Sequence, residues 1–128
     1  MKSDIEKLKY KVDCGADYIV TQMFFDNKHY FNFVDQCNKI GIKIPIIPGI
    51  KILSLERHLE ALPKHFYLNL PKELIKSVEG KSKSEIRVSG IDWAISQIQE
   101  LIDYGAPCIH FYIMSSAKSA TKVVSNFI

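Results

Sequence analysis

Residues 17–26, Asp-Tyr-Ile-Val-Thr-Gln-Met-Phe-Phe-Asp, form the most strand-like stretch of this sequence. Its β-branched and aromatic residues predict a buried parallel strand over residues 18–25. Gln22 is the uncharged polar side chain near the carboxyl end of that strand. A buried amide without hydrogen-bond partners costs stability, so we expect the Gln22 side chain to be paired.

Gln22 is also the first candidate for a ligand-binding residue. In parallel α/β folds, ligands bind at the carboxyl ends of the strands. A carboxamide donates and accepts hydrogen bonds at once, which suits a flat heterocycle with neighbouring N–H and C=O groups. The alternative is a core amide whose partners all lie within the protein.

Helical and strand-like patterns alternate along the chain, with glycine, proline or serine at many boundaries. A first helix is predicted from Ser3 to Gly15. Residues 80–84 are polar and are predicted to form a flexible loop. Further helices are predicted over 30–40, from Ser54 to Pro63, after Pro71, over 91–102, and after Ser115 or Ser116. Further strands are predicted over 44–50 and 108–114, and Pro48-Gly49 is expected to break the first of these at its carboxyl end.

This alternation predicts an α/β fold built from right-handed βαβ units with a parallel sheet. Only three strands are predicted. Three parallel strands cannot close a barrel, and they leave both edges of the sheet unpaired. We therefore expect residues 1–128 to be one part of a larger fold.

Composition excludes several classes of function. The 128 residues carry a net charge of +3, and the lysines are scattered without a basic stripe, so no nucleic-acid role is expected. No signal peptide and no membrane-spanning run is found, which predicts a cytoplasmic protein. Cys14, Cys37 and Cys108 form no metal-binding or disulfide pattern, and the first two are expected to be small core residues.

Four segments, in their order and spacing, resemble the methylenetetrahydrofolate reductase family. They are Asp4 with residues 11–17, and residues 19–26, 45–50 and 110–112. The resemblance implies the last three β/α units of a (β/α)8 TIM barrel, covering the chain from Asp4 to its end. It also implies a flavoprotein of one-carbon metabolism that interconverts tetrahydrofolates for methionine biosynthesis.

The implied reaction is the reduction of 5,10-methylenetetrahydrofolate to 5-methyltetrahydrofolate by NADH or NADPH through FAD. Gln22 falls on the family's glutamine that hydrogen-bonds the folate and lies near the nicotinamide. Asp4 and Lys11 fall on flavin-binding positions, and Lys7 and Tyr10 match further flavin contacts. The alternative is a solvated helix face on which Asp4 is favoured by the helix dipole.

The sequence departs from the family at several positions. His58 stands where the family commonly has a glutamine that contacts substrate. Ser116 stands where many members carry a basic residue that could meet the folate carboxylates, and Lys118 follows two residues later. Ile113 replaces the usual threonine. No nearby carboxylate or cysteine gives His110 a catalytic or metal-ligand pattern, so it is expected to be a hydrogen-bonded core histidine.

The family's catalytic glutamate, most of its flavin contacts and the aspartate that partners the pterin lie in the first part of the barrel. None of those segments is present in these 128 residues. We therefore expect no catalytic residue here, no activity of this chain alone, and a requirement for a separate N-terminal chain. A homo-oligomer is also expected. The alternative function is a non-catalytic remnant, or a module for folate binding or protein interaction.

Overall fold

A computed structural model describes residues 2–66, 70–113 and 118–127 of the chain. Three parallel strands form one sheet in the order β1 (Ile19–Met23), β2 (Ile46–Ile50) and β3 (His110–Phe111). Within the described residues the sheet is open, with β1 and β3 at its edges. The prediction of parallel strands with covering helices in an unclosed sheet is confirmed.

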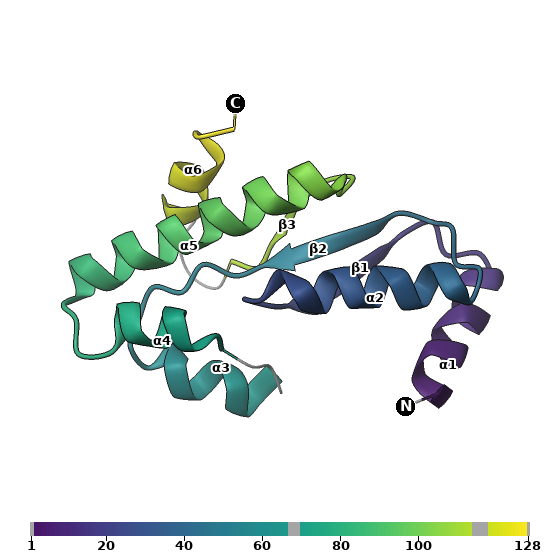
Figure 1. The fold of residues 1–128 in the computed structure, drawn as a ribbon, viewed down its shortest axis with the longest axis horizontal. Coiled ribbons are helices and arrows are strands. Elements are labelled where there is room, and N and C mark those ends of the chain that lie inside the picture. The colour runs from purple at the N-terminus through teal and green to yellow at the C-terminus, as the bar shows by residue number, and fades with distance from the viewer. Residues whose placement is uncertain (1, 67–69, 114–117, 128) are drawn as a thin grey trace.

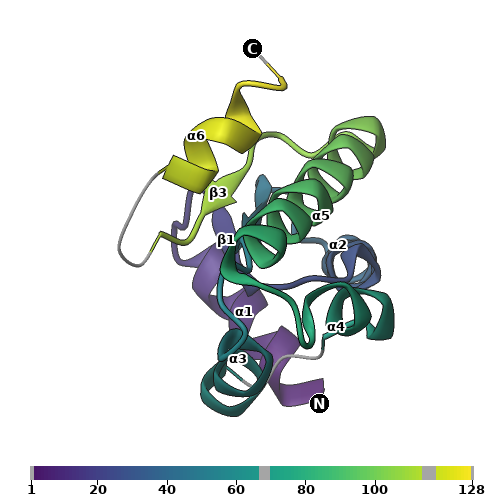
Figure 2. The same ribbon diagram turned by 90° about the vertical axis from the view of Figure 1, so that its left-hand side faces the viewer.

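The described part of the chain also contains six helices (Figure 1). One face of the sheet packs against α2, α5 and α6 (Figures 1 and 2). Helices α3 and α4 lie beyond the carboxyl ends of the strands, and α1 lies at the other end of the molecule. None of the described helices is long and apolar enough to cross a membrane. The helices are α1 (Lys2–Asp13), α2 (Asn27–Lys39), α3 (His58–Phe66), α4 (Lys72–Val78), α5 (Lys83–Tyr104) and α6 (Lys118–Val124).

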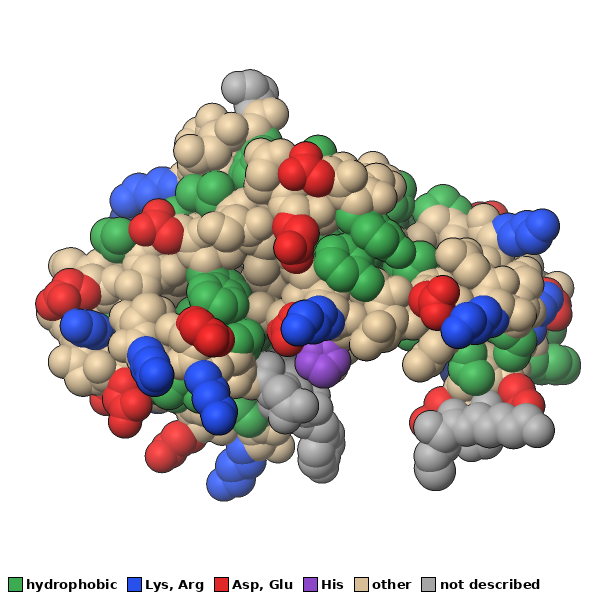
Figure 3. Space-filling view, in the orientation of Figure 1, with side chains coloured by type: hydrophobic (Ala, Val, Ile, Leu, Met, Phe, Trp, Pro, Cys, Tyr) green, Lys and Arg blue, Asp and Glu red, His purple; other side chains and the backbone are tan. Residues whose placement is uncertain are grey.

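Two apolar clusters form the core, and α5 contributes to both. The larger cluster lies between the sheet and α2, α5 and α6, and apolar residues of α1 pack against it. The smaller cluster lies where the end of β1 meets α3, α4 and the start of α5. The rings of Phe31 on α2 and Tyr104 on α5 lie 4.3 Å apart. Figure 3 shows hydrophobic side chains exposed on one side of the molecule. Typical members are Tyr30, Cys37, Ile50, Ile98 and Val123 in the larger cluster and Phe25, Leu53, Leu62, Leu74 and Ile86 in the smaller.

Side chains of α5 hold the chain where it leaves β1. Beyond Met23 the strand ladder stops, yet Phe24 and Phe25 remain buried. Trp93 Nε1 donates to the Phe25 carbonyl at 2.9 Å, and Gln97 Nε2 donates to the Phe24 carbonyl at 3.2 Å. These bonds satisfy buried carbonyls and explain why β1 ends earlier than the predicted residue 25.

The third strand is also shorter than predicted. Strand β3 covers two residues instead of 108–114, and its pairing with β2 is continued by the hydrogen bond from Tyr112 N to the Ile50 carbonyl at 2.9 Å. Ser115 and Ser116, the predicted caps of the last helix, lie outside the described residues.

Two helices begin earlier than the sequence suggested. Helix α1 already includes Ser3, so that residue does not precede the helix as a cap. Helix α5 begins inside the predicted loop 80–84, because the Ser82 side chain accepts a hydrogen bond from Glu85 N at 3.2 Å. The Ser-x-x-Glu pattern is a capping signal that the sequence prediction overlooked.

The start and end of α3 differ as well. The helix begins at His58 rather than after Ser54, and it continues through Pro63 to Phe66. Proline removes one intrahelical hydrogen bond, and only three helical residues follow it, so the loss is limited. The prediction that Pro63 ends this helix was wrong.

Of the predictions that Cys14, Cys37 and His110 are buried, only the one for Cys37 holds. Cys37 is fully buried in the larger cluster, as predicted, but Cys14 is exposed because it follows the last residue of α1. His110 is exposed instead of lying in the core, and its ring lies 4.7 Å from that of Tyr112, edge to face. Strand β3 is an edge strand with one uncovered face, which leaves His110 in solvent.

Gly90 is required by the contact between α5 and the chain after β2. A Cβ at this position would lie 1.7 Å from the Leu53 carbonyl oxygen, a backbone atom that no rotamer change can move. We therefore predict that Gly90→Ala lowers the free energy of unfolding by about 3 kcal/mol, the upper end of overpacking effects. Urea unfolding followed by circular dichroism measures this change.

Ser96→Ala, on the exposed side of the same helix, is the matched control and should change stability by less than about 0.5 kcal/mol. Equal stability of Gly90→Ala and the wild-type chain would contradict the close approach of Leu53 to α5.

Candidate functional site

The pairing of β1 and β2 is irregular at the position of Gln22. Val20 pairs with Ile47 and Met23 pairs with Gly49, so β1 advances three residues while β2 advances two. One extra residue in one strand is a β-bulge, a feature that redirects side chains and is common beside active sites. Gln22 lies within this bulge.

The Gln22 side chain is exposed, so the prediction that it is buried was wrong. The reason is that α2, α5 and α6 cover only one face of the sheet; Val20, two residues earlier, is also 37% exposed. Gln22 Oε1 accepts a hydrogen bond from Met23 N at 3.1 Å, whereas its Nε2 has no partner among the described residues. Gln22 therefore offers a free N–H donor to a ligand.

Gly49 allows the ring of Tyr112 to cross β2. A Cβ at Gly49 would lie 2.5 Å from Tyr112 Cε2 and 2.7 Å from the Thr21 carbonyl oxygen. The Tyr112 hydroxyl donates to that same carbonyl at 2.7 Å, and Gly49 N donates to Thr21 Oγ1 at 3.0 Å. Pro48 and Gly49 thus lie inside β2 rather than breaking it, and they connect all three strands beside Gln22.

His58 holds the turn that precedes α3. Its Nδ1 lies 3.2 Å from Ser54 N and 3.3 Å from Leu55 N and accepts from both. The neutral ring therefore carries its proton on Nε2, the nitrogen left for a ligand. Burial lowers the pKa of His58, and the positive charges of Lys51 and Arg57 lower it further.

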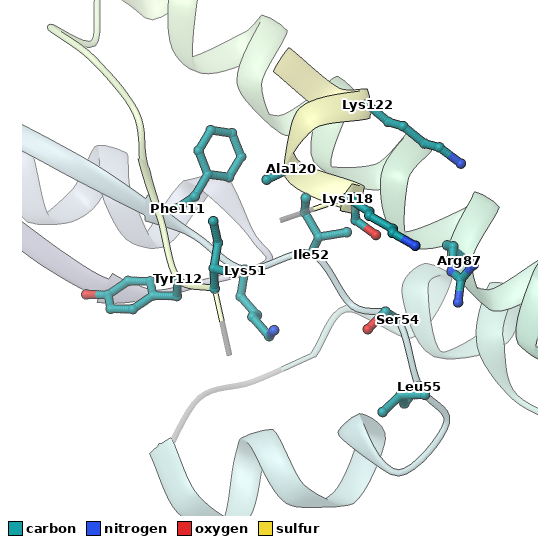
Figure 4. A pocket seen from close by; sticks show the side chains of 12 residues that line it. Lys51, Ile52, Ser54, Leu55, Arg87, Phe111, Tyr112, Lys118, Ala120 and Lys122 are labelled. Carbon is teal, nitrogen blue, oxygen red and sulfur yellow. The ribbon is translucent and has the colours of Figure 1, made fainter. Parts of the chain in front are cut away.

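A cavity of about 350 Å³ opens at the carboxyl ends of β2 and β3 (Figure 4). Its walls come from the β2–α3 connection, the first half of α5, the end of β3, and α6. Four cations line it, Lys51, Arg87, Lys118 and Lys122, and none of the described lining residues is an aspartate or glutamate. Sequence reasoning singled out only Lys118, because the other three lie far apart in the chain.

The candidate flavin contacts lie on α1. Asp4, Lys7, Tyr10 and Lys11 are all exposed, and Tyr10 is 72% exposed. Helix α1 lies at the opposite end of the molecule from α3, so these residues are not brought to His58 (Figure 1).

A parallel α/β sheet with polar side chains and a cavity at the carboxyl ends of its strands is the arrangement in which β/α proteins commonly bind ligands. The fold is similar to that of a Clostridium thermocellum protein that binds two copies of 5-methyl-5,6,7,8-tetrahydrofolic acid. The TM-score is 0.59 at 14% identity, over 96% of this chain and 46% of that one. At this identity the likeness concerns the fold alone.

The family model of methylenetetrahydrofolate reductase matches residues 1–127, and this chain belongs to that family. It is 35% identical over 127 residues to methylenetetrahydrofolate reductase (NADH) 1 of Arabidopsis thaliana and 32% identical to a probable NADPH enzyme of Caenorhabditis elegans. It is 33% identical over 119 residues to 5,10-methylenetetrahydrofolate reductase of Buchnera aphidicola. These matches cover 98%, 98% and 91% of this chain but only 22%, 19% and 41% of the relatives.

The accepted hydrogen bonds of His58 predict a dependence of stability on pH. Because the folded-state pKa is lowered, the neutral ring contributes stability that is present above the unfolded value of about 6.5. This contribution is lost as the pH falls from there through the folded-state pKa. Asparagine can accept from the same backbone N–H groups without titrating, so His58→Asn should lose less stability than the wild-type chain between pH 7.5 and pH 5.

Urea unfolding at a series of pH values measures how the free energy of unfolding changes with pH. At pH 7.5 the His58→Asn substitution should lower that free energy by about 1 kcal/mol or less. The matched control is His29→Asn, an exposed position on α2, which should keep the wild-type slope. An identical slope in His58→Asn and the wild-type chain would show that His58 does not cause the dependence.

Proposed function

We propose that this chain is the C-terminal part of a methylenetetrahydrofolate reductase, which reduces 5,10-methylenetetrahydrofolate to 5-methyltetrahydrofolate with NAD(P)H and FAD. The observation that carries this proposal is the family match over residues 1–127. The position of Gln22 in an exposed bulge, where its amide can reach a ligand, supports it. We write the electron donor as NAD(P)H because the similar relatives include both an NADH enzyme and a probable NADPH enzyme.

Gln22 and His58 are the substrate-binding residues in this proposal. Gln22 donates from Nε2 to an acceptor on the pterin, and its Oε1 keeps one lone pair for a donor there. His58 donates from Nε2, because its Nδ1 is already committed to the backbone. Both side chains bind and orient the substrate, and neither moves a proton.

The donors on α1 fit the phosphate groups of FAD. Neither Lys7 nor Lys11 forms an ion pair within the described residues, whereas Lys9 between them is paired with Asp13 at 2.6 Å. Two exposed, unpaired ammonium groups can hold phosphate oxygens as point charges, and Asp4 and Tyr10 add polar contacts on the same helix. When bound, FAD supplies the hydride-transfer chemistry.

Further β/α units are needed to complete the site in this proposal. The chain spans about a fifth of the plant and nematode relatives and two fifths of the bacterial one. In the described residues β1 and β3 each have an edge free to pair, and the face that carries Gln22 is uncovered. A separate N-terminal chain would supply the missing strands, and a homo-oligomer would be built from the completed barrels.

We predict that the 128-residue chain alone retains no flavin and shows no folate-dependent oxidation of NADH, because it carries only part of the site. A chimera should restore activity, in which these residues replace the matching 119-residue segment of the Buchnera enzyme. In that chimera Gln22→Ala should lower kcat/KM for the folate about tenfold, the value of one or two hydrogen bonds.

Gln36→Ala, at an exposed position on α2, is the control and should leave kcat/KM unchanged. Flavin absorbance of each purified chimera shows whether it folds. A flavin-loaded chimera without activity would overturn the proposal. If the 128-residue chain then bound folate saturably in equilibrium dialysis, the alternative of a non-catalytic folate-binding module would be favoured.

A further inference from the structure

The cavity at the carboxyl ends of β2 and β3 gathers cations from separate elements. Lys51 follows β2, Arg87 lies in the first half of α5, and Lys118 and Lys122 lie on α6. Lys51 reaches in from the end of β2 and Lys118 extends in the direction of Arg87, whereas Lys122 points away from Lys51 (Figure 4). Like charges that line one cavity repel each other, and a bound anion would relieve that repulsion.

Lys51 gives the strongest indication of an anionic ligand. It is only 7% exposed, and its neighbours Ile50 and Ile52 are buried in the core, which fixes the backbone on both sides. Its ammonium forms no hydrogen bond or ion pair with a described residue. Burial lowers the pKa of Lys51, and no carboxylate offsets that effect. A buried cation without a counter-charge costs stability, and a bound anion would remove that cost.

The other donors around the cavity favour phosphate over carboxylate. Arg87 supplies a planar fork of N–H groups, and the hydroxyls of Ser54 and Ser119 line the same space. A phosphate group carries up to two charges and three acceptor oxygens at one centre, enough to meet several of these donors together. A carboxylate carries one charge and two oxygens. The volume of about 350 Å³ also exceeds that of a lone phosphate and leaves room for an attached organic group.

We propose that the cavity lined by Lys51, Arg87 and Lys118 binds the phosphate groups of a small organic phosphate. Lys51 contributes a positive charge from the β2 side of the cavity, and Arg87 contributes N–H donors from the α5 side. Neither Gln22 nor His58 lines this cavity, although Tyr112, which hydrogen-bonds to Thr21 beside Gln22, forms part of its wall. The proposal does not depend on the reductase activity.

Inorganic pyrophosphate is the first probe, titrated into the 128-residue chain by calorimetry and by thermal unfolding at constant ionic strength. We expect saturable binding and a rise in the unfolding midpoint. Lys51→Met should weaken pyrophosphate binding about tenfold or more, the value of one charge-assisted contact. Without pyrophosphate this variant should unfold at or above the wild-type temperature, because it removes a buried charge.

Arg87→Gln, at an exposed position, provides a second variant whose folding is not in question and should also weaken binding. Lys76→Met, on the exposed side of α4, is the matched control and should bind as the wild-type chain does. An equal rise of the midpoint in all four proteins would reveal general salt stabilisation and overturn the proposal. Tighter binding of triglutamate than of pyrophosphate would overturn it too, since the cavity would then be a carboxylate site.

Discussion

Where β1 leaves the sheet, its backbone stays buried but loses its strand partners, and the carbonyls of Phe24 and Phe25 need donors from elsewhere. Trp93 and Gln97 supply them from α5, at a separation of about seventy residues along the chain. Gln97 Oε1 is left buried with no partner in the described structure, a cost of about 1–3 kcal/mol that the anchoring must exceed. The chain at the carboxyl end of β1 is therefore held by α5.

The close approach of Gly90 to Leu53 extends the same attachment from β1 to the chain that follows β2. Helix α5 therefore holds the chain after β1 and the chain after β2, and it carries Arg87 in the wall of the cavity. The opposite face of the sheet has no such cover. Packing of helices on the covered face fixes the strands that carry the candidate binding groups. The uncovered face leaves Gln22 accessible to a ligand, and the free edges of the sheet are accessible to further strands.

Local patterns in the sequence predicted the elements well and their surroundings poorly. The apolar residues of 17–26 and the periodicity of 91–102 led directly to β1 and α5, because each pattern reflects packing against one neighbour. The burial of Gln22 could not be predicted, since it depends on which face of an open sheet is covered. The cationic cavity was missed for a related reason: Lys51, Arg87 and Lys122 come to line one cavity only once α5 and α6 pack on the sheet.

Trp93 is the only tryptophan in the chain, and its indole N–H is bonded to the backbone at the end of β1. The wavelength of indole fluorescence responds to the polarity and hydrogen bonding around the ring. The emission of this protein is therefore an intrinsic optical reporter of the junction between α5 and β1. It would register, without any label, a ligand or an additional polypeptide that alters the geometry at the end of this strand.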